Sequence, residues 1–377
     1  MRIIQGKKEQ DGNWEFLSDE RNLREPLVLV FGNRYTLEST SLYDEIKTMF
    51  PDGHIVFGST AGEILESEVL DQSLSLTAME FEKSTFTVQR ANVADFTDTV
   101  QDLGMALLKK LPKEGLQHIF VVSEGSSVNG SGLIEGMEKE LPTGVTLSGG
   151  LCGDDARFER TLASYNENPK EGEVIAIGLY GDTLEVTCAN YGGWTGFGPK
   201  RTITKSKDNV LYELDGLPAL DLYKTYLGEK AKELPQAALL YPLSVKTLDS
   251  KESIVRTILN INEEENTMIL AGDVPEGAEV QLMMSTVDDI VHGAQTAATF
   301  AMRDRKNEPE LGLLISCVGR KLVMDQRTEE EVEEVIEVIG TKAKVAGFYS
   351  YGEMAPFAGA DQCKLHNQTM TLTLISE

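Results

Sequence analysis

One short pattern of residues occurs three times along this chain. It reads IVFGSTAGEI at 55–64, TLSGGLCGDD at 146–155 and VAGFYSYGEM at 345–354. In each copy a short apolar run ends at a glycine, and a later glycine is followed directly by Glu or Asp. A glycine at the end of a buried strand lets the backbone turn sharply or approach a ligand closely. The repetition predicts a fold assembled from copies of one supersecondary unit.

The residues before each Gly turn complete the unit as strand, loop, helix, strand and turn. Its first strands are PLVLVFGN (26–33), HIFVVSEG (118–125) and LGLLISCVGR (311–320). Apolar residues at helical spacing follow, and strand-like runs return after each turn. Copies two and three share a longer lead-in, in which TFTVQRAN (85–92) corresponds to EVQLMMST (279–286). In the third copy, Thr328 and Glu331 have the spacing of a helix capping box.

These units predict the fold class α/β, with two domains built from duplicated strand–helix–strand units and mixed sheets. The chain has 377 residues, more than one domain usually contains. Segment 192–209 is rich in glycine and basic residues, unlike its surroundings, and marks the domain boundary. We expect an N-terminal segment at 1–25, a first domain at 26–200 and a second domain at 201–377.

The charge balance and the cysteines limit the partners and the compartment. There are 61 acidic and 35 basic residues, a formal net charge of −26, which opposes binding to nucleic acid or to an anionic membrane. The four cysteines form no CxxC pair and fit a reducing compartment. We find no signal peptide and no apolar run of membrane-spanning length. We expect a cytoplasmic protein.

Several of these stretches resemble the FIST family (F-box and intracellular signal transduction), with its FIST N and FIST C domains. The resemblance covers nearly the whole chain from residue 26 and rests on FGSTAGEI, SGGLCGDD, GWTGFG, NVLYELDGLPALDLY, LLISCVGR and GFYSYGEMAP followed by LHNQTMTL. It implies a sensory, small-ligand-binding module, with amino acids as proposed ligands, and some members of the family resemble haem-binding nitric-oxide sensors. Family partners are histidine kinases or cyclic-dinucleotide enzymes. Because two domains account for the 377 residues of this chain and leave none for an output domain, we expect it to signal through a separate partner protein.

The richest polar cluster predicted by the repeat is C-terminal. Its members are Cys317, Arg320, Tyr349, Tyr351, Glu353, His366 and Asn367. The repeat makes SCVGR and GFYSYGE the ends of neighbouring strands, where open α/β sheets bind ligands. Arg320 could clamp a carboxylate, Glu353 could hold an ammonium and the tyrosines could form a wall, which together suit a zwitterion such as an amino acid. The alternative is a structural network that pairs Arg320 with Glu353.

The matching N-terminal cluster contains Ser59, Thr60, Glu63, Asp154 and Asp155. Ser59, Glu63 and Asp154 are its candidate ligand contacts, and the alternative for the aspartates is helix capping or solvation. We expect Glu63 near a cavity, with Glu63→Gln altering binding more than folding. Trp194 is a candidate lid or domain-interface anchor. The loop GSSVNGSG (125–132) precedes a helix whose N-terminus could bind an anion.

Enzymatic motifs are absent from the sequence, which has no GxSxG, HExxH or P-loop. We expect a non-enzymatic protein with no metal and no obligatory cofactor. Two alternatives stay open. One is an uncharacterised thiol-dependent enzyme that uses Cys317 with His366. The other is a haem sensor, for which His54, His118, His292 and His366 are the available histidines.

Overall fold

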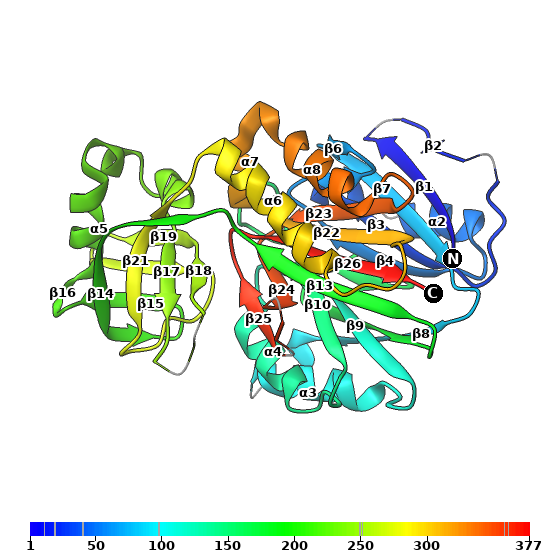
Figure 1. The fold of residues 1–377 in the computed structure, drawn as a ribbon, viewed down its shortest axis with the longest axis horizontal. Coiled ribbons are helices and arrows are strands. Elements are labelled where there is room, and N and C mark those ends of the chain that lie inside the picture. The colour runs from blue at the N-terminus through cyan, green and yellow to red at the C-terminus, as the bar shows by residue number, and fades with distance from the viewer. Residues whose placement is uncertain are drawn as a thin grey trace.

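Three copies of one four-stranded unit form the larger part of the structure, called the body here, and a small lobe stands beside it (Figure 1). This computed structural model describes the chain except residues 11, 19, 40, 97–98, 249, 251, 358 and 361. None of the helices within the described ranges is long and apolar enough to cross a membrane.

Each unit has two adjacent parallel strands, a third strand antiparallel to one of them, and a fourth beside the third. Unit 1 contains, in sheet order, β4 (His54–Ser59), β3 (Leu27–Gly32), β7 (Ser73–Glu80) and β1 (Arg2–Glu9), with β2 (Glu15–Phe16) at its edge. Unit 2 contains β10 (Thr146–Leu151), β9 (Leu116–Ser123), β12 (Glu173–Tyr180) and β8 (Thr85–Asn92). Unit 3 contains β23 (Lys344–Ser350), β22 (Leu311–Cys317), β26 (Met370–Ser376) and β13 (Glu185–Tyr191). The predicted equivalence of the three Gly turns is confirmed.

After its Gly turn, each unit contributes one strand to the sheet of another unit. Strand β5 (Glu63–Leu65) of unit 1 pairs with β23 of unit 3, and β24 (Gly352–Pro356) of unit 3 pairs with β10 of unit 2. Strand β11 (Ala163–Tyr165) of unit 2 pairs with β4 of unit 1, which closes the cycle. Two further strands, β6 (Glu68–Leu70) and β25 (Cys363–His366), extend the sheets beyond β5 and β24. The three units are therefore interlocked.

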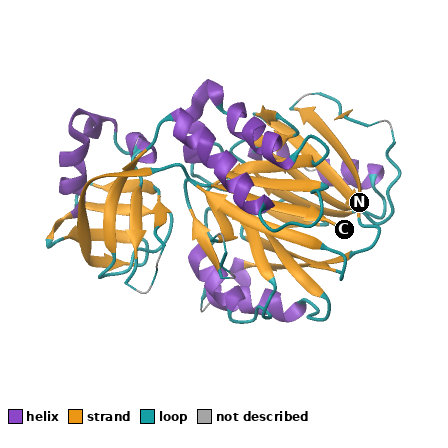
Figure 2. Ribbon diagram, viewed as in Figure 1, coloured by secondary structure: helices purple, strands orange, loops and turns teal. Residues whose placement is uncertain are grey.

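Helices cover the outer faces of the three sheets (Figure 2). Unit 1 carries α1 (Arg34–Leu37) and α2 (Leu42–Met49). Unit 2 carries the short turn η1 (Val93–Asp95), α3 (Val100–Lys110) and α4 (Gly130–Glu138). Unit 3 carries α6 (Val287–Met302), α7 (Val318–Met324), the turn η4 (Asp325–Arg327) and α8 (Glu329–Ile339). Helices α6 and α8 lie over one sheet, and α3 and α4 lie over another (Figure 1).

The central core lies where the inner faces of the three sheets meet. Along β3, Leu29 and Phe31 belong to this core, whereas Val28 and Val30 pack with Ile46 of α2 on the outer face. The rings of Phe31 and Phe348 lie 4.6 Å apart and join units 1 and 3. Strands covered on both faces need apolar residues at successive positions, which explains the continuous apolar runs.

The small lobe is an insertion into unit 3, between β13 and α6. It contains β14 (Thr195–Lys207), β15 (Val210–Leu214), β16 (Leu217–Pro218), β17 (Leu243–Lys246), β18 (Ile254–Arg256), β19 (Ile258–Asn262), β20 (Thr267–Leu270) and β21 (Glu279–Met284). Its helical segments are α5 (Ala219–Leu227), η2 (Gly228–Glu233) and η3 (Gln236–Leu240). The strands form one curved sheet around an apolar core of their own.

The insertion corrects one sequence assignment. The stretch EVQLMMST was matched to the lead-in strand of unit 2, but β21 belongs to the small lobe, where it pairs with β14 and β17. The lead-in strand of unit 3 is β13, which pairs with β26. The error arose because β21 directly precedes α6 in sequence, whereas the whole lobe separates β13 from α6.

The predicted fold class is confirmed as mixed α/β with mixed sheets and a two-domain arrangement. The chain leaves the body after β13, close to the expected boundary at residue 200. It returns at Ser285, so that residues 285–377 join the same body as residues 1–191. The small lobe is thus attached to the body through two chain segments.

Candidate functional site

The three Gly turns form a ring of backbone hydrogen bonds. The amide of Ala61 donates to the carbonyl of Tyr349 at 2.9 Å, and Gly153 N–H donates to Ser59 O at 2.9 Å. The amide of Tyr351 donates to Leu151 O at 3.1 Å and completes the ring. The repeated glycines thus serve close packing of the turns.

The carboxylates after the first and third turns, Glu63 and Glu353, are equivalent and buried. Glu63 accepts hydrogen bonds from the hydroxyls of Thr60 and Ser73. Glu353 accepts from Ser350 Oγ at 2.6 Å and from Thr369 Oγ1 at 2.9 Å. Burial raises the pKa of Glu63 and of Glu353 to about 8. Both are mainly neutral acids at pH 7 that bind hydroxyl groups of their own units.

The carboxylate after the second turn, Asp154, forms an ion pair. Arg34 Nε donates to Asp154 Oδ1 at 3.0 Å, and both residues are buried. Ser59 Oγ accepts the backbone N–H of Leu162 at 2.8 Å. The polar groups of Ser59, Asp154 and Glu63 therefore all bind other parts of the protein in this structure.

Arg320 lies in a buried network with Glu331. Its Nε and Nη2 donate to one Glu331 oxygen at 3.0 and 2.7 Å, and the hydroxyl of Tyr349 donates to the other oxygen at 2.8 Å. Glu331 therefore does not form the predicted capping box with Thr328, whose side chain does not cap α8. The structure unites Arg320 with Tyr349, and the predicted alternative partner Glu353 binds Ser350 and Thr369.

Arg320 and Glu353 were predicted to face one ligand cavity, but neither side chain lines the cavities described in this section. Both are fully buried, and their polar atoms bind neighbouring protein groups. The sequence signal was misleading because adjacent strand ends bring residues near each other without deciding which way the side chains point.

His366 and Asn367 lie beneath the surface, in and after β25. His366 Nε2 is 3.0 Å from the carbonyl of Ala355, and burial lowers the pKa of His366 to about 4, which keeps the ring neutral. Asn367 Nδ2 donates to the carbonyl of Tyr351 at 3.4 Å, and its Oδ1 has no partner among the described residues. Burial, followed by nearby Glu353, raises the pKa of the Cys317 thiol, which disfavours the nucleophilic thiolate.

The histidines give no support to a haem site. Both ring nitrogens of His118 bind hydroxyls, those of Thr146 and Ser148 at 2.7 and 2.9 Å, and the ring is buried. His54 lines a cavity of about 260 Å³, and its Nδ1 is 2.6 Å from the hydroxyl of Tyr165. A haem ligand needs an available nitrogen beside a large apolar space, and neither His118 nor His54 combines the two.

Tyr351 is the predicted site residue that borders a cavity. Its ring stacks on Phe158 with centroids 4.4 Å apart, and its hydroxyl accepts the Phe158 N–H at 2.9 Å. The cavity has a volume of about 310 Å³, and loop 125–130 and residues 270–272 of the small lobe also line it. The predicted anion-binding loop and Tyr351 thus share one cavity, called the upper pocket here.

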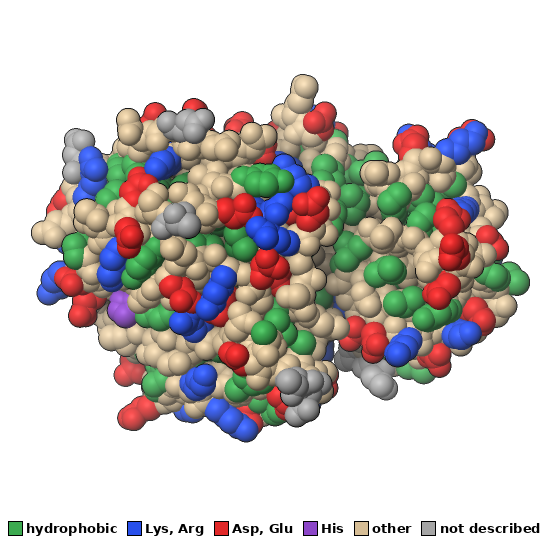
Figure 3. Space-filling view, turned by 180° about the vertical axis from the view of Figure 1, so that it is seen from behind, with side chains coloured by type: hydrophobic (Ala, Val, Ile, Leu, Met, Phe, Trp, Pro, Cys, Tyr) green, Lys and Arg blue, Asp and Glu red, His purple; other side chains and the backbone are tan. Residues whose placement is uncertain are grey.

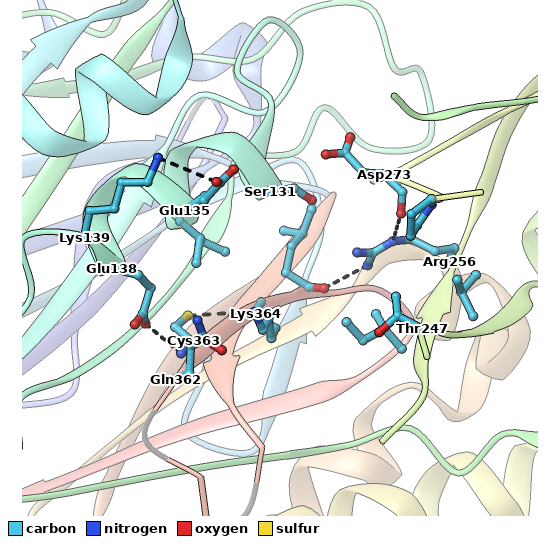
Figure 4. A pocket seen from close by; sticks show the side chains of 15 residues that line it. Ser131, Glu135, Glu138, Lys139, Thr247, Arg256, Asp273, Gln362, Cys363 and Lys364 are labelled. Carbon is cyan, nitrogen blue, oxygen red and sulfur yellow. Dashed lines mark hydrogen bonds and ion pairs between the residues drawn. The ribbon is translucent and has the colours of Figure 1, made fainter. Parts of the chain in front are cut away.

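A second cavity of about 510 Å³, the lower pocket, adjoins the upper pocket between the same two lobes (Figure 4). Helix α4 and strand β25 form its body side, and β17, β18 and residues 273–275 form its lobe side. Asn129 Nδ2 donates to Asp273 Oδ1 at 3.4 Å across the boundary between the pockets. From behind, the surface is indented where the lobes meet (Figure 3). We call the two pockets together the cleft.

The two segments that join the lobes are held by buried polar contacts. Arg320 donates to the carbonyl of Gly192 in the first segment and to the carbonyl of Ile290 in α6, the body helix that follows the second segment. Ser285 Oγ donates to Gly193 O at 2.8 Å, which ties the segments together. Trp194 Nε1 donates to Gln368 O at 2.8 Å, so that this side chain anchors the first segment to the body. A glycine is required at 193, where φ is +76° and a Cβ would lie 2.1 Å from the Asp289 carbonyl oxygen.

A third cavity, of about 520 Å³, borders the first Gly turn away from the cleft. Ala61, Asp71, Asp155 and Lys321 are among its lining residues. Lys321 Nζ donates to Ala61 O at 2.9 Å and pairs with Asp71. Glu63 lies beneath this turn with 1% of its surface exposed, and its carboxylate does not line the cavity.

The fold and the cleft together define a class: a two-lobed α/β protein whose small lobe is inserted into a body of three interlocked units. Family models for the FIST N domain and the FIST C domain match residues 26–217 and 219–356. The chain belongs to the FIST family. FIST domains are sensory and signal-transduction modules.

An uncharacterized protein of Methanocaldococcus jannaschii is 23% identical to this chain over 380 residues, which cover 89% of this chain and 70% of that protein. Among solved structures, cyanuric acid hydrolase from A. caulinodans gives a TM-score of 0.18 at 12% identity, with 78% of this chain and 99% of that chain covered. Phosphoribosylformylglycinamidine synthase II from Thermotoga maritima gives a TM-score of 0.22 at 10% identity, with 84% and 74% covered. Likeness at this level indicates no shared activity.

Proposed function

We propose that this chain is a sensory module that binds a small polar ligand in the cleft and signals through a separate partner protein. The observation that carries the proposal is the position of the cleft. Both lobes line the upper pocket and the lower pocket, and the lobes are joined by two chain segments. Pockets between lobes are a common place for small ligands.

A ligand in the cleft would contact both lobes at once. Its binding would favour the lobe orientation in which both sets of contacts form, and this differential affinity is what shifts a conformational equilibrium. Hydrogen bonds that join the lobes at the pockets include Asn129 Nδ2 to Asp273 Oδ1 at 3.4 Å and Arg256 Nη1 to Leu365 O at 2.8 Å, and a change in lobe orientation would act on both. The changed orientation is the signal that we propose for the partner.

The polar lining supports a zwitterionic ligand such as an amino acid. The lower pocket is lined by charges of both signs, with Glu135, Glu138, Lys139 and Lys364 from the body and Arg256 and Asp273 from the small lobe. A lining with both signs of charge matches a ligand that carries an ammonium and a carboxylate. We propose binding in place of catalysis, and the raised pKa of the Cys317 thiol supports this choice over a thiol enzyme.

The partner that we propose is a histidine kinase or a cyclic-dinucleotide enzyme, as the family suggests. A cytoplasmic location is part of the same proposal. It is supported by the four cysteines, all of which are free thiols in the structure.

We expect one or more of the twenty proteinogenic amino acids to raise the melting temperature of the purified protein, because a ligand that binds the native state stabilises it by RT ln(1 + [L]/Kd). Differential scanning fluorimetry measures the shift. Tyr351→Ala should reduce the shift because it removes a ring from the wall of the upper pocket. Tyr191→Ala is the matched control, since Tyr191 is 45% exposed and lies outside both pockets.

Lobe movement is measured separately, by electron–electron distances between spin labels at Glu114→Cys in the body and Leu217→Cys in the small lobe, both exposed positions. A stabilising amino acid that leaves the distance distribution unchanged would contradict signalling by reorientation. If none of the twenty amino acids raises the melting temperature, amino acids are rejected as the ligand class. A Soret band at about 400 nm in the absorption spectrum of the purified protein would favour the haem alternative.

A further inference from the structure

Arg256 differs from the other buried arginines of this protein in having no carboxylate partner. Arg34 pairs with Asp154 at 3.0 Å and Arg320 pairs with Glu331 at 2.7 Å. Arg256 is 6% exposed, and among the residues that the structure describes no carboxylate oxygen lies within 4.0 Å of its nitrogens. A buried cation without an opposite charge is costly, so such a residue needs an explanation.

Two carbonyl oxygens hold the Arg256 guanidinium in place. Its Nη1 donates to Leu365 O of the body at 2.8 Å, and its Nε donates to Asp273 O of the small lobe at 3.3 Å. A guanidinium has five N–H donors in a planar fork, and no described acceptor binds Nη2. The planar group is therefore fixed in orientation while part of its donor capacity is unused.

The unused donors belong to a residue that lines the lower pocket. In Figure 4 the guanidinium extends from the small lobe toward the body, and the Asp273 carboxylate points away from it. Ser131, in the first turn of α4, lines the same pocket, and its Oγ is buried without a partner among the described residues. Lys364 of β25 adds a second positive charge to the lining. An arginine fork, a hydroxyl and an ammonium around one space match the acceptor oxygens of a carboxylate.

Glu135 and Glu138 lie on the α4 side of the lower pocket, and Asp273 lies on its lobe side, where its carboxylate accepts from Asn129 Nδ2 at 3.4 Å. Glu138 accepts the Cys363 N–H at 2.7 Å, and Glu135 pairs with Lys139 at 3.6 Å. These carboxylates oppose a multiply charged anion in the pocket, whereas a single negative charge next to Arg256 meets less repulsion. The lining therefore favours a carboxylate over a phosphate.

We propose that Arg256 binds the carboxylate group of the ligand in the lower pocket. This inference rests on the proposed function in placing the ligand in the cleft. Because Arg256 belongs to the small lobe and already contacts Leu365 of the body, a carboxylate bound there connects the two lobes directly. Arg256 is thus both the specificity residue and the link between ligand and lobe orientation.

The test follows the side-chain Nε–Hε signal of Arg256 by nuclear magnetic resonance in the full chain labelled with ¹⁵N-arginine. Sodium acetate, a small carboxylate probe, is titrated, with sodium chloride at equal ionic strength as the comparison. We expect a saturable shift of the Arg256 signal with acetate and none with chloride. The signal of Arg305 is the internal control, because its guanidinium binds Thr187, Leu374 and Ser376 and lines no pocket of the described chain.

Arg256→Lys assigns the signal and should lower the affinity for acetate about tenfold or more, because it keeps the charge and removes the fork. Where this variant fails to fold, Gly272→Ala replaces it, since a Cβ at 272 would lie 2.9 Å from Arg256 Cζ and displace the guanidinium. A second titration with inorganic phosphate separates carboxylate binding from general oxyanion binding.

Absence of a saturable shift with acetate would overturn the inference, as would an equal or larger response to phosphate. An amino acid that stabilises the wild type and Arg256→Lys equally would also overturn it, while leaving the proposed function intact. Conversely, acetate binding at Arg256 without any change in the distance between the lobes would keep this site and contradict the proposed signalling.

Discussion

Replacing Arg320 by alanine is expected to lower the free energy of unfolding by about 3–5 kcal/mol, because it leaves the fully buried Glu331 carboxylate without its partner. The same change removes hydrogen bonds to Gly192 O, in the first segment that joins the lobes, and to Ile290 O, in the helix that follows the second segment. We therefore expect lower stability together with a wider distribution of lobe orientations. Urea unfolding followed by circular dichroism measures the first effect, and spin-label distances measure the second.

The control for this change is Arg303→Ala. Arg303 lies at the C-terminal end of α6, over the ring of Phe300 at 4.7 Å, and makes no ion pair among the described residues. Its loss should change the free energy of unfolding by about 1 kcal/mol or less. An Arg320→Ala protein as stable as the wild type, but unable to respond to amino acids, would contradict the anchoring role and return Arg320 to the ligand site.

The second large effect concerns pH and the two equivalent acids. The unfolded carboxyl pKa is near 4.5, whereas burial raises the pKa of Glu63 and of Glu353 to about 8 in the folded protein. The protonated carboxyl of each residue makes its full contribution to stability below the unfolded pKa, and this contribution is lost as the pH rises through the folded pKa. Between these values, each group should lower the free energy of unfolding by about 1 kcal/mol per pH unit.

The variants Glu63→Gln and Glu353→Gln lack this titration while keeping the shape of the side chain. Their stability relative to the wild type should therefore rise with pH across that window, and the double variant should show about twice the slope. Urea unfolding at several pH values measures the difference. Glu333→Gln is the control, because Glu333 is exposed on α8. Parallel pH profiles for the wild type and Glu63→Gln would show that Glu63 is ionised in the folded protein.

The three units could be predicted because their signals are local. Buried strands, glycine turns and helical spacing repeat within each unit and do not depend on distant contacts. The exchange of β5, β11 and β24 among the units leaves no such signal, since the paired strands lie far apart in the sequence. The lead-in strand of unit 3 was also assigned wrongly, because the inserted small lobe separates β13 from the rest of its unit in the sequence.

The candidate site was harder to predict than the fold. Tyr351 and loop 125–130 were named from sequence, and the structure brings them to one pocket. Glu331 has the sequence position of a helix cap, yet its carboxylate turns inward to Arg320. Arg256 lies in an ordinary β-hairpin, and only the tertiary structure shows that it is buried without a carboxylate partner in the described chain. Charge pairing in a core depends on side-chain direction, which residue type and spacing do not encode.

The exchange of strands β5, β11 and β24 among the three units has a consequence for the synthesis and folding of this chain. During synthesis, units 1 and 2 emerge long before β24, so the edge of β10 that β24 later covers stays open while the whole small lobe is translated. An open strand edge is a template for pairing with another chain. The first half of the protein is thus exposed to misassociation until its C-terminal strands arrive. The body should acquire its stability late and in one cooperative step, and a fragment cut between the two family domains at residue 218 would lack one side of its core.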